Sequence, residues 1–260
     1  MPDYYHHLDA PESSIVDWNV GGYPVRVPRF LADRQGDKSS WECARFQHME
    51  RHLRPGMTLF DVGSEQGYMS AIYARFVGGG ENMCLFEPVP QAWPNIKIIW
   101  EANGLVKPRA TWCGFAGDRS WISEYHESAT GSRDGWPECA YGDNLLDATK
   151  FKYISEHAHC TDSITLNEFV ASTGVVPDAL TMDVEGFEPT VIAGAVNVIR
   201  AHRPLIWLSV HNPNGNNILQ KYTGSAHLDE MHHTLLDLGY SVEIIAEDHE
   251  RHTFYHPLEA

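Results

Sequence analysis

Short apolar runs that alternate with amphipathic helical patterns constrain the fold of this chain more than any other feature. Five runs are predicted to form buried strands, and they lie at residues 57–63, 82–88, 110–118, 178–186 and 204–212. Helical spacing of apolar residues follows the first run, and Pro189 after the fourth run fits the first turn of another amphipathic helix. Strands that alternate with helices in this way predict an α/β fold with a mostly parallel sheet.

The C-terminal part of the chain breaks this alternation. A helical pattern ends at Gly239, and two short strand patterns follow at residues 240–245 and 252–256, with a polar turn between them. Two strands joined by a short turn run in opposite directions. We therefore expect a terminal antiparallel hairpin.

The pattern indicates one main domain with two irregular segments. Residues 1–38 are rich in proline and polar residues and are expected to form an N-terminal extension that packs on the core. Residues 39–260 form the predicted domain, which opens with a helix that has Ser39 and Glu42 as a capping box. Within it, residues 119–160 have no clear period and are a candidate substrate lid.

Composition excludes several classes of partner. The chain has 260 residues, of which 43% are hydrophobic, enough to bury the core of one large domain. Its 19 basic and 35 acidic residues give a formal charge of −16, which repels nucleic acid and anionic lipid. It has no apolar run long enough to span a membrane, no signal-peptide pattern, and five scattered cysteines without a C-x-x-C pair. We expect a cytoplasmic protein that binds neither membranes nor nucleic acid. The sequence does not determine its oligomeric state.

The sequence FDVGSEQGY, residues 60–68, has the features of a ligand-binding turn. Asp61 ends the first predicted strand of the sheet, and Gly63 and Gly67 let the backbone approach a ligand without a Cβ atom in the way. A dinucleotide site would have G-x-G-x-x-G and a helix N-terminus open to phosphate. Here Glu65 places a carboxylate in that turn, which disfavours phosphate.

A second acidic residue defines the expected ligand further. Glu87 ends the next strand, where a carboxylate can accept hydrogen bonds from both hydroxyls of a ribose. An acidic turn beside a ribose-binding carboxylate suits an adenosyl ligand that carries an ammonium and a sulfonium in place of phosphates. The predicted cofactor is S-adenosylmethionine, and Ser64 and Tyr68 of the same turn join the candidate binding residues.

Five segments, in this order, resemble the FkbM family of S-adenosylmethionine-dependent methyltransferases. They are FDVGSEQGYMS, LFEPVP, GFAGD, DSITLNEFV and PDALTMDVEGFEPTVIAGA. The resemblance covers roughly residues 55–245, and its most specific part is the D-V-E-G-x-E block at the fourth strand. The chain departs from the family at Ser64 and Glu65, where Ala-Asn is more usual, and in its long segment 119–160.

The resemblance implies a class I methyltransferase (Rossmann-like) fold, with seven strands of which the last is antiparallel. It also implies O-methylation of hydroxyl groups on sugars or natural-product-like small molecules. In similar methyltransferases, a residue in the position of Asp118 contacts the adenine amine, so Asp118 joins the candidate cofactor-binding residues.

Three residues at strand ends are the candidates for catalysis. Asp183 and Glu185 follow the fourth strand and His211 ends the fifth, where the sheet edge faces the transferred methyl group. The hydroxyl proton of an acceptor must be removed or its charge stabilised, either by His211 as general base or by Mg²⁺ or Mn²⁺ held by Asp183 and His211. The sequence leaves both routes open, and Glu185 could instead favour the positive end of the following helix.

Other interpretations stay open at this stage. The fold could belong to a nicotinamide-dependent Rossmann oxidoreductase or to a catalytically silent binding module. Trp121 and Trp136 could stack on a sugar or cover the core. Asp248, His249 and His252 form a small polar cluster that is expected to be a solvated hairpin tip rather than a metal site.

Overall fold

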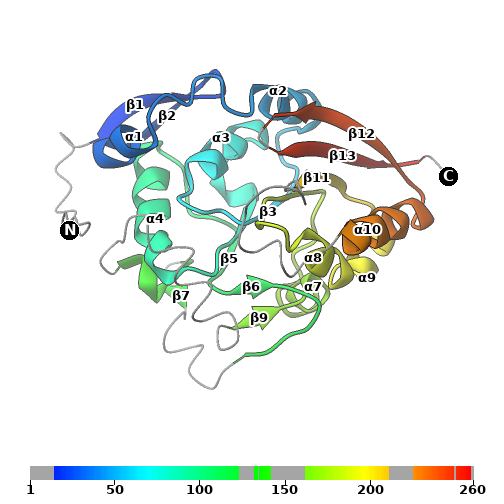
Figure 1. Ribbon diagram of the computed structural model, residues 1–260. Helices are drawn as coiled ribbons and strands as arrows, with labels where there is room; N and C mark the ends of the chain where they lie inside the picture. The colour runs from blue at the N-terminus through cyan, green and yellow to red at the C-terminus, as the bar shows by residue number, and fades with distance from the viewer. Residues whose placement is uncertain are drawn as a thin grey trace.

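The computed structural model describes residues 15–122, 132–133, 135–141, 162–210, 225–248 and 250–258. Its centre is a seven-stranded sheet with the order β12-β13-β11-β10-β3-β4-β5 (Figure 1). The strands are β3 (Leu59–Val62), β4 (Met83–Phe86), β5 (Ala110–Trp112), β10 (Ala179–Met182), β11 (Leu205–Val210), β12 (Tyr240–Glu247) and β13 (Arg251–Pro257). All five predicted strands therefore contribute to one sheet.

The strand directions confirm the predicted fold. β3 pairs in parallel with β10 and β4, and the outer pairs β10–β11 and β4–β5 are also parallel. β13 runs antiparallel to both of its neighbours, β11 and β12. The terminal hairpin therefore forms one end of the sheet, with β12 at the edge and β13 between β12 and β11. The fold is α/β, with a mostly parallel sheet and an antiparallel C-terminal hairpin.

Helices cover both faces of the sheet, as the buried strands require. Successive residues of a strand point to opposite faces, and so Leu59 packs in one core cluster and Phe60 in the other. The first cluster contains α2 (Cys43–His52), α3 (Tyr68–Phe76) and α4 (Trp93–Ala102). The second contains α7 (Leu166–Thr173), α8 (Glu188–Ala193), α9 (Val196–His202) and α10 (Ser225–Asp237).

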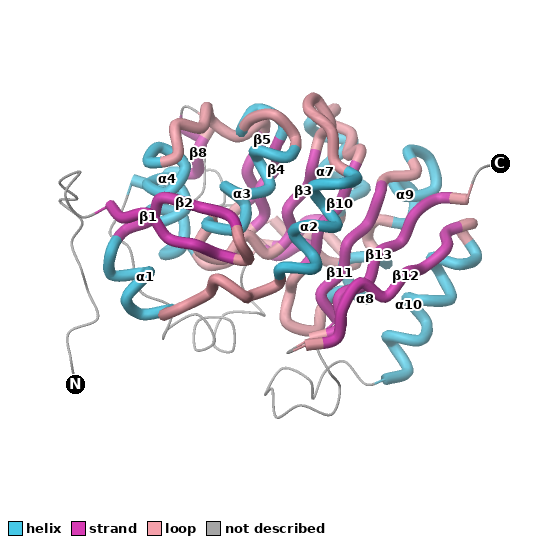
Figure 2. Tube along the Cα trace, turned by 90° about the horizontal axis from the view of Figure 1, so that it is seen from above, coloured by secondary structure: helices cyan, strands magenta, loops and turns pink. Residues whose placement is uncertain are grey.

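The described part of the N-terminal segment forms a hairpin of β1 (Ile15–Val20) and β2 (Tyr23–Pro28), followed by α1 (Arg29–Gln35). Val25 and Val27 belong to the first core cluster, and the backbone amide of Arg26 donates to Asn103 Oδ1 at the end of α4. Figure 2 shows this hairpin near the β5–β4 end of the sheet, far from α10 beside β12.

Two local predictions were wrong. The run 110–118 is interrupted after β5, and its second part, β6 (Phe115–Ala116), pairs with β9 (Ser163–Ile164) in a separate small sheet. A Cβ atom at Gly114 would lie 2.6 Å from the carbonyl oxygen of Asp162, so close backbone packing fixes the break there. The capping box is also absent, because α2 begins at Cys43 and Glu42 makes no side-chain cap.

Most of the candidate lid 119–160 lies outside the described residues. Its described parts include β7 (Ser132–Arg133), which pairs with β8 (Trp136–Pro137), and a 3-10 turn over Glu138–Tyr141. Trp136 is buried edge-on against Trp100, with ring centres 6.1 Å apart, so it belongs to the core. Trp121 is 48% exposed. No helix in the described part of the chain has the length and apolar character needed to cross a bilayer.

Candidate functional site

The glycines of the turn after β3 allow close contact between parts of the protein. Gly63 and Gly67 have φ angles of 92° and 82°, in the region that favours glycine. A Cβ atom on Gly63 would lie 2.0 Å from the carbonyl oxygen of Asp183, and one on Gly67 would lie 2.9 Å from the Cα of Ile96. The two glycines therefore bring the turn against the end of β10 and against α4.

Asp61 is buried near the carboxyl end of β3, one residue before its last residue, Val62. Its side chain accepts a hydrogen bond from the Ser70 hydroxyl, while Ser64 donates to its main-chain carbonyl at 3.1 Å. Burial raises the pKa of Asp61 to about 6, and the bond from Ser70 and the charge of Arg45 only partly oppose this. Asp61 is thus a carboxylate whose charge the folded chain does not fully compensate.

Glu87 connects the ends of two neighbouring strands. Its Oε2 accepts a hydrogen bond from the backbone amide of Glu65 at 2.8 Å, and its Oε1 accepts one from the amide of Val89 at 2.9 Å. The residue is buried. The predicted ribose carboxylate therefore also holds the turn after β3 in place.

Asp118 follows β6 and has a different environment. Its side chain is 52% exposed and lies 3.7 Å from Arg119. The preceding Gly117 packs against Gly194, where a Cβ atom would lie 1.8 Å from the Gly117 carbonyl oxygen. The loop that carries Asp118 is therefore fixed on the turn between α8 and α9.

A cavity of about 150 Å³ lies at the carboxyl ends of β3 and β10. Acidic side chains dominate its wall, and they are Glu42, Asp61, Glu65, Asp183, Glu185 and Glu250. Lys38 and Arg45 are the basic residues that line it. The wall also includes Gly63, Ser64 and Tyr68 of the predicted turn, so these candidates share one cavity with Asp183 and Glu185.

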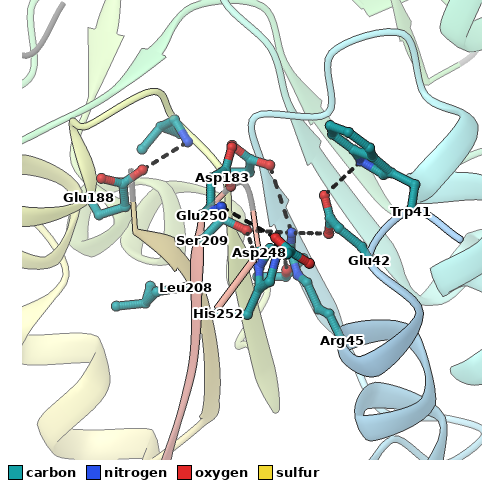
Figure 3. A network of polar contacts seen from close by, with 12 residues as sticks. Trp41, Glu42, Arg45, Asp183, Glu188, Leu208, Ser209, Asp248, Glu250 and His252 are labelled. Carbon is teal, nitrogen blue, oxygen red and sulfur yellow. Dashed lines mark hydrogen bonds and ion pairs between the residues drawn. The ribbon is translucent and has the colours of Figure 1, made fainter. Parts of the chain in front are cut away.

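Arg45 is the centre of a buried polar network at this cavity (Figure 3). Its Nη1 donates to Glu42 Oε2 at 2.8 Å and to Ser209 Oγ at 2.6 Å. Its Nη2 donates to Thr181 Oγ1 at 2.7 Å, and Asp183 Oδ2 lies 3.7 Å from Nη1. The Arg45 side chain is only 2% exposed. These contacts supply the opposite charges and the hydrogen-bond acceptors that a buried cation requires.

The network continues into the terminal hairpin. His252 Nε2 lies 3.2 Å from Asp248 Oδ1, and its Nδ1 lies 3.0 Å from Ser209 Oγ. A carboxylate only accepts, so Nε2 carries the proton, and Nδ1 of the neutral ring accepts from the Ser209 hydroxyl. Burial and the charge of Arg45 lower the pKa of His252, which favours this neutral form. The prediction of a solvated tip is wrong for His252, which is buried, and His249 lies outside the described residues.

The structure places two of the three candidate catalytic residues. Asp183 and Glu185 both line the cavity, and Glu185 has a left-handed φ of 56°. The turn that carries them is held by Glu188, whose Oε1 accepts from the amides of Val184 and Gly186, each at 3.2 Å. His211 lies outside the described residues.

The same limit applies to the proposed metal pair of Asp183 and His211. Among the residues that the structure describes, no group of three or more His, Cys, Asp or Glu side chains is placed to hold a metal ion.

Several residues that line this cavity were not predicted from the sequence, and Glu42, Arg45 and Tyr73 are among them. One signal was present. Arg45 and Met49 are one helical turn apart, so Arg45 lies on the buried face of α2. A charged residue on an apolar face indicates a buried partner.

The sheet order, the inserted antiparallel β13 and the cavity at the ends of β3 and β10 define a class I S-adenosylmethionine-dependent methyltransferase fold. The sequence profile described as "Methyltransferase FkbM domain" matches residues 61–242, and the chain belongs to this family. The match confirms the resemblance found in the sequence.

Solved structures with the same fold include methyltransferase FkbM from Methylobacillus flagellatus KT, with 12% identity and a TM-score of 0.50. The alignment covers 83% of this chain and 59% of that structure, so the chain spans less than two thirds of its length. An S-adenosylmethionine-dependent O-methyltransferase from Thermotoga maritima is 12% identical, with a TM-score of 0.47 and coverage of 89% and 71%. No protein of curated function matches the sequence.

Proposed function

We propose that this protein is an S-adenosylmethionine-dependent O-methyltransferase that methylates a hydroxyl group of a sugar or natural-product-like small molecule. The observation that carries the proposal is that the turn after β3 and the acidic end of β10 line the same cavity. Its six carboxylates outnumber its two basic side chains, which suits a cofactor with ammonium and sulfonium charges better than one with phosphates. Family membership supports the same reaction class.

The proposed cofactor site combines the residues at the ends of β3 and β4 with one after β6. Asp61, Gly63, Ser64, Gly67 and Tyr68 form the turn that holds the cofactor. Two further carboxylates extend the site: Glu87 binds the ribose and Asp118 the adenine amine. A carboxylate oxygen can accept more than one hydrogen bond, so the bonds that Glu87 accepts from backbone amides are compatible with ribose binding.

S-adenosylmethionine supplies a methyl group that its sulfonium already activates. The remaining task of the chain is to align an acceptor hydroxyl and to manage its proton, and alignment alone can contribute on the order of 7 kcal/mol. Asp183 and Glu185 line the cavity and in this proposal accept the hydrogen bond of the acceptor hydroxyl. Arg45 Nη1 lies 3.7 Å from Asp183 Oδ2 and pairs with its charge.

His211, the third proposed catalytic residue, is a general base or, with Asp183, a ligand of Mg²⁺ or Mn²⁺. Chelator separates the two roles, because it abolishes turnover only if a metal takes part. His211→Ala reduces turnover in both cases, and full activity of that variant would remove His211 from the mechanism.

Calorimetry followed by a label-transfer assay tests the proposal. S-adenosylmethionine and S-adenosylhomocysteine should bind with dissociation constants in the micromolar range, whereas NAD and ATP should not bind. Methyl-labelled cofactor should then transfer label to small hydroxylated acceptors. Binding of NAD without binding of the adenosyl ligands would contradict the proposal, and cofactor binding with no transfer would favour a silent binding module. The acidic charge supports small molecules over nucleic acid as partners.

A further inference from the structure

Two buried side chains of the cavity each keep one hydrogen-bonding atom without a partner among the described residues. They are Nε of Arg45 and the hydroxyl oxygen of Tyr73. Arg45 is 2% exposed and Tyr73 is 1% exposed, and both line the cavity. The Arg45 guanidinium lies 5.9 Å from the centre of the Tyr73 ring, so the two unpaired atoms belong to neighbouring groups. Leaving such groups unpaired costs free energy, and each calls for an explanation.

Both groups act as hydrogen-bond donors. Arginine stays protonated in proteins and has no acceptor. Burial raises the pKa of Tyr73 well above its usual value, so the hydroxyl keeps its proton, although the charge of Arg45 works in the opposite direction. The ligand group that satisfies both must offer acceptor oxygens. A carboxylate is the best match, because charge-assisted hydrogen bonds to it are about twice as strong as neutral ones.

The acidic side chains around these two donors require that the ligand also carry a positive charge. Glu42, Asp61 and Asp183 line the same cavity, and burial disfavours the charged form of Asp61. A ligand with a carboxylate alone would be repelled by this wall, whereas an adjacent ammonium group would be attracted to it. The chemistry that satisfies donors and acidic side chains together is that of an α-amino acid.

We propose that Arg45 Nε and the Tyr73 hydroxyl bind the α-carboxylate of the cofactor's methionine moiety, while Asp61 and Glu42 bind its ammonium group. This inference rests on the proposed function and extends it to residues that the sequence did not indicate. Arg45 and Glu42 precede residues 61–242, the part of the chain that matches the family profile. The recognition of the carboxylate is therefore assigned to α2 and α3 of this chain.

Decarboxylated S-adenosylmethionine tests the proposal, because it keeps the sulfonium and the amine but lacks the carboxylate. An acidic cavity without a carboxylate site would bind it more tightly than S-adenosylmethionine. The proposed site predicts the reverse: calorimetry should show at least about tenfold weaker binding of the decarboxylated ligand. Tyr73→Phe should weaken binding of S-adenosylmethionine about five- to tenfold and leave the decarboxylated ligand unaffected.

Thermal unfolding without ligand gives an independent measure. Tyr73→Phe removes an unpaired buried hydroxyl, so the ligand-free variant should be at least as stable as the parent chain. Tyr255→Phe is the matched control: its hydroxyl bonds His232 Nδ1 at 3.0 Å in the other core cluster. That variant should lose stability and keep the affinity and the selectivity. Arg45→Lys keeps the charge but removes the Nε donor, and it should reduce the selectivity further.

The outcomes are distinct. Equal or tighter binding of the decarboxylated ligand by the parent chain would overturn the carboxylate site while leaving the proposed function intact. So would a selectivity that Tyr73→Phe does not change. Failure of S-adenosylmethionine to bind would overturn the proposed function, and this inference with it.

Discussion

At the scale of the residue, Asp61 combines a structural cost with a proposed role. It is 5% exposed, and its pKa is raised to about 6 mainly by burial. In the unfolded chain its pKa is the usual 3.8. Between these values the folded state binds more protons than the unfolded state, so this residue lowers stability as pH rises through that range. A cationic ligand would relieve this cost, because it stabilises the charged form.

Asp61→Asn should therefore stabilise the ligand-free protein at pH 7.5 by about 1 to 3 kcal/mol, because the amide carries no charge to bury. Little gain is expected at pH 3.5, where the parent carboxyl is already protonated. The same variant should bind S-adenosylmethionine more weakly. Urea unfolding at both pH values measures the first effect, with Asp17→Asn, an exposed site, as control. An equal gain at both pH values would show that ionisation of Asp61 is not the cause.

Glu87 should show a joint effect on binding and stability. Glu87→Ala removes the acceptors of the Glu65 and Val89 amides together with the proposed ribose contact. We expect cofactor affinity to fall by about 1 to 3 kcal/mol and the unfolding free energy to fall by a similar amount. Calorimetry and urea unfolding measure the two quantities. An unchanged affinity in the folded variant would place the ribose elsewhere.

Position along the chain explains which site residues the sequence could indicate. Asp61, Asp183 and Glu185 stand at the ends of apolar runs, and parallel strands bring those ends to one edge. Arg45 is different, because its partners Thr181 and Ser209 are 136 and 164 residues away. Neither helical periodicity nor a local motif contains that information.

At the scale of the element, the strands, the mostly parallel sheet and the terminal hairpin followed from the pattern, while boundaries and turns depended on tertiary contacts. Each of the five apolar runs contributes a strand to one sheet. This was predictable because strands that are buried on both faces appear in a sequence as nearly continuous apolar runs. The break after β5 was not predictable, because it depends on the approach of Gly114 to Asp162. Likewise, Glu42 had the spacing of a capping box but binds Arg45 instead.

The turn of the terminal hairpin was predicted to be a solvated tip, but in the structure it contributes to the cavity. Glu250 lines the cavity, and Asp248 and His252 connect this turn to Arg45 through Ser209. Such a chain of hydrogen bonds fixes the hairpin and the Arg45 side chain relative to one another. The hairpin therefore belongs to the site as well as to the sheet edge.

His252→Ala should lower the unfolding free energy by about 1 to 3 kcal/mol at pH 8, because it removes the acceptor of the buried Ser209 hydroxyl and the donor to Asp248 Oδ1. Burial and Arg45 lower the pKa of His252 below its usual 6.5, while Glu42, Asp248 and Glu250 oppose this. The neutral ring thus contributes stability that is lost as pH falls through the folded pKa. The cost of the substitution should be smaller at pH 5 than at pH 8. Equal costs in urea unfolding at both pH values would contradict this account.

At the scale of the whole molecule, the cavity connects parts of the chain that are far apart in sequence. Its wall takes Glu42 from the start of α2, Asp183 from the end of β10 and Glu250 from the last hairpin. The sequence predicted the sheet that brings these parts together, but not the cavity between them, because the cavity depends on side chains from elements that are far apart in the sequence. A ligand bound there contacts groups that separate on unfolding, so binding and global stability are coupled.

S-adenosylmethionine at about 100 times its dissociation constant should therefore stabilise the folded protein by about 2.7 kcal/mol. For a chain of this length, that corresponds to a rise in Tm of roughly 5 to 10 °C. NAD at the same concentration should leave Tm unchanged, since the acidic wall disfavours its phosphates. Glu87→Ala should reduce the shift produced by S-adenosylmethionine, because weaker binding at a fixed concentration gives less stabilisation. Differential scanning fluorimetry measures all three responses. An equal shift with NAD, or a shift that Glu87→Ala does not reduce, would mean that the ligand binds outside the proposed adenosyl site.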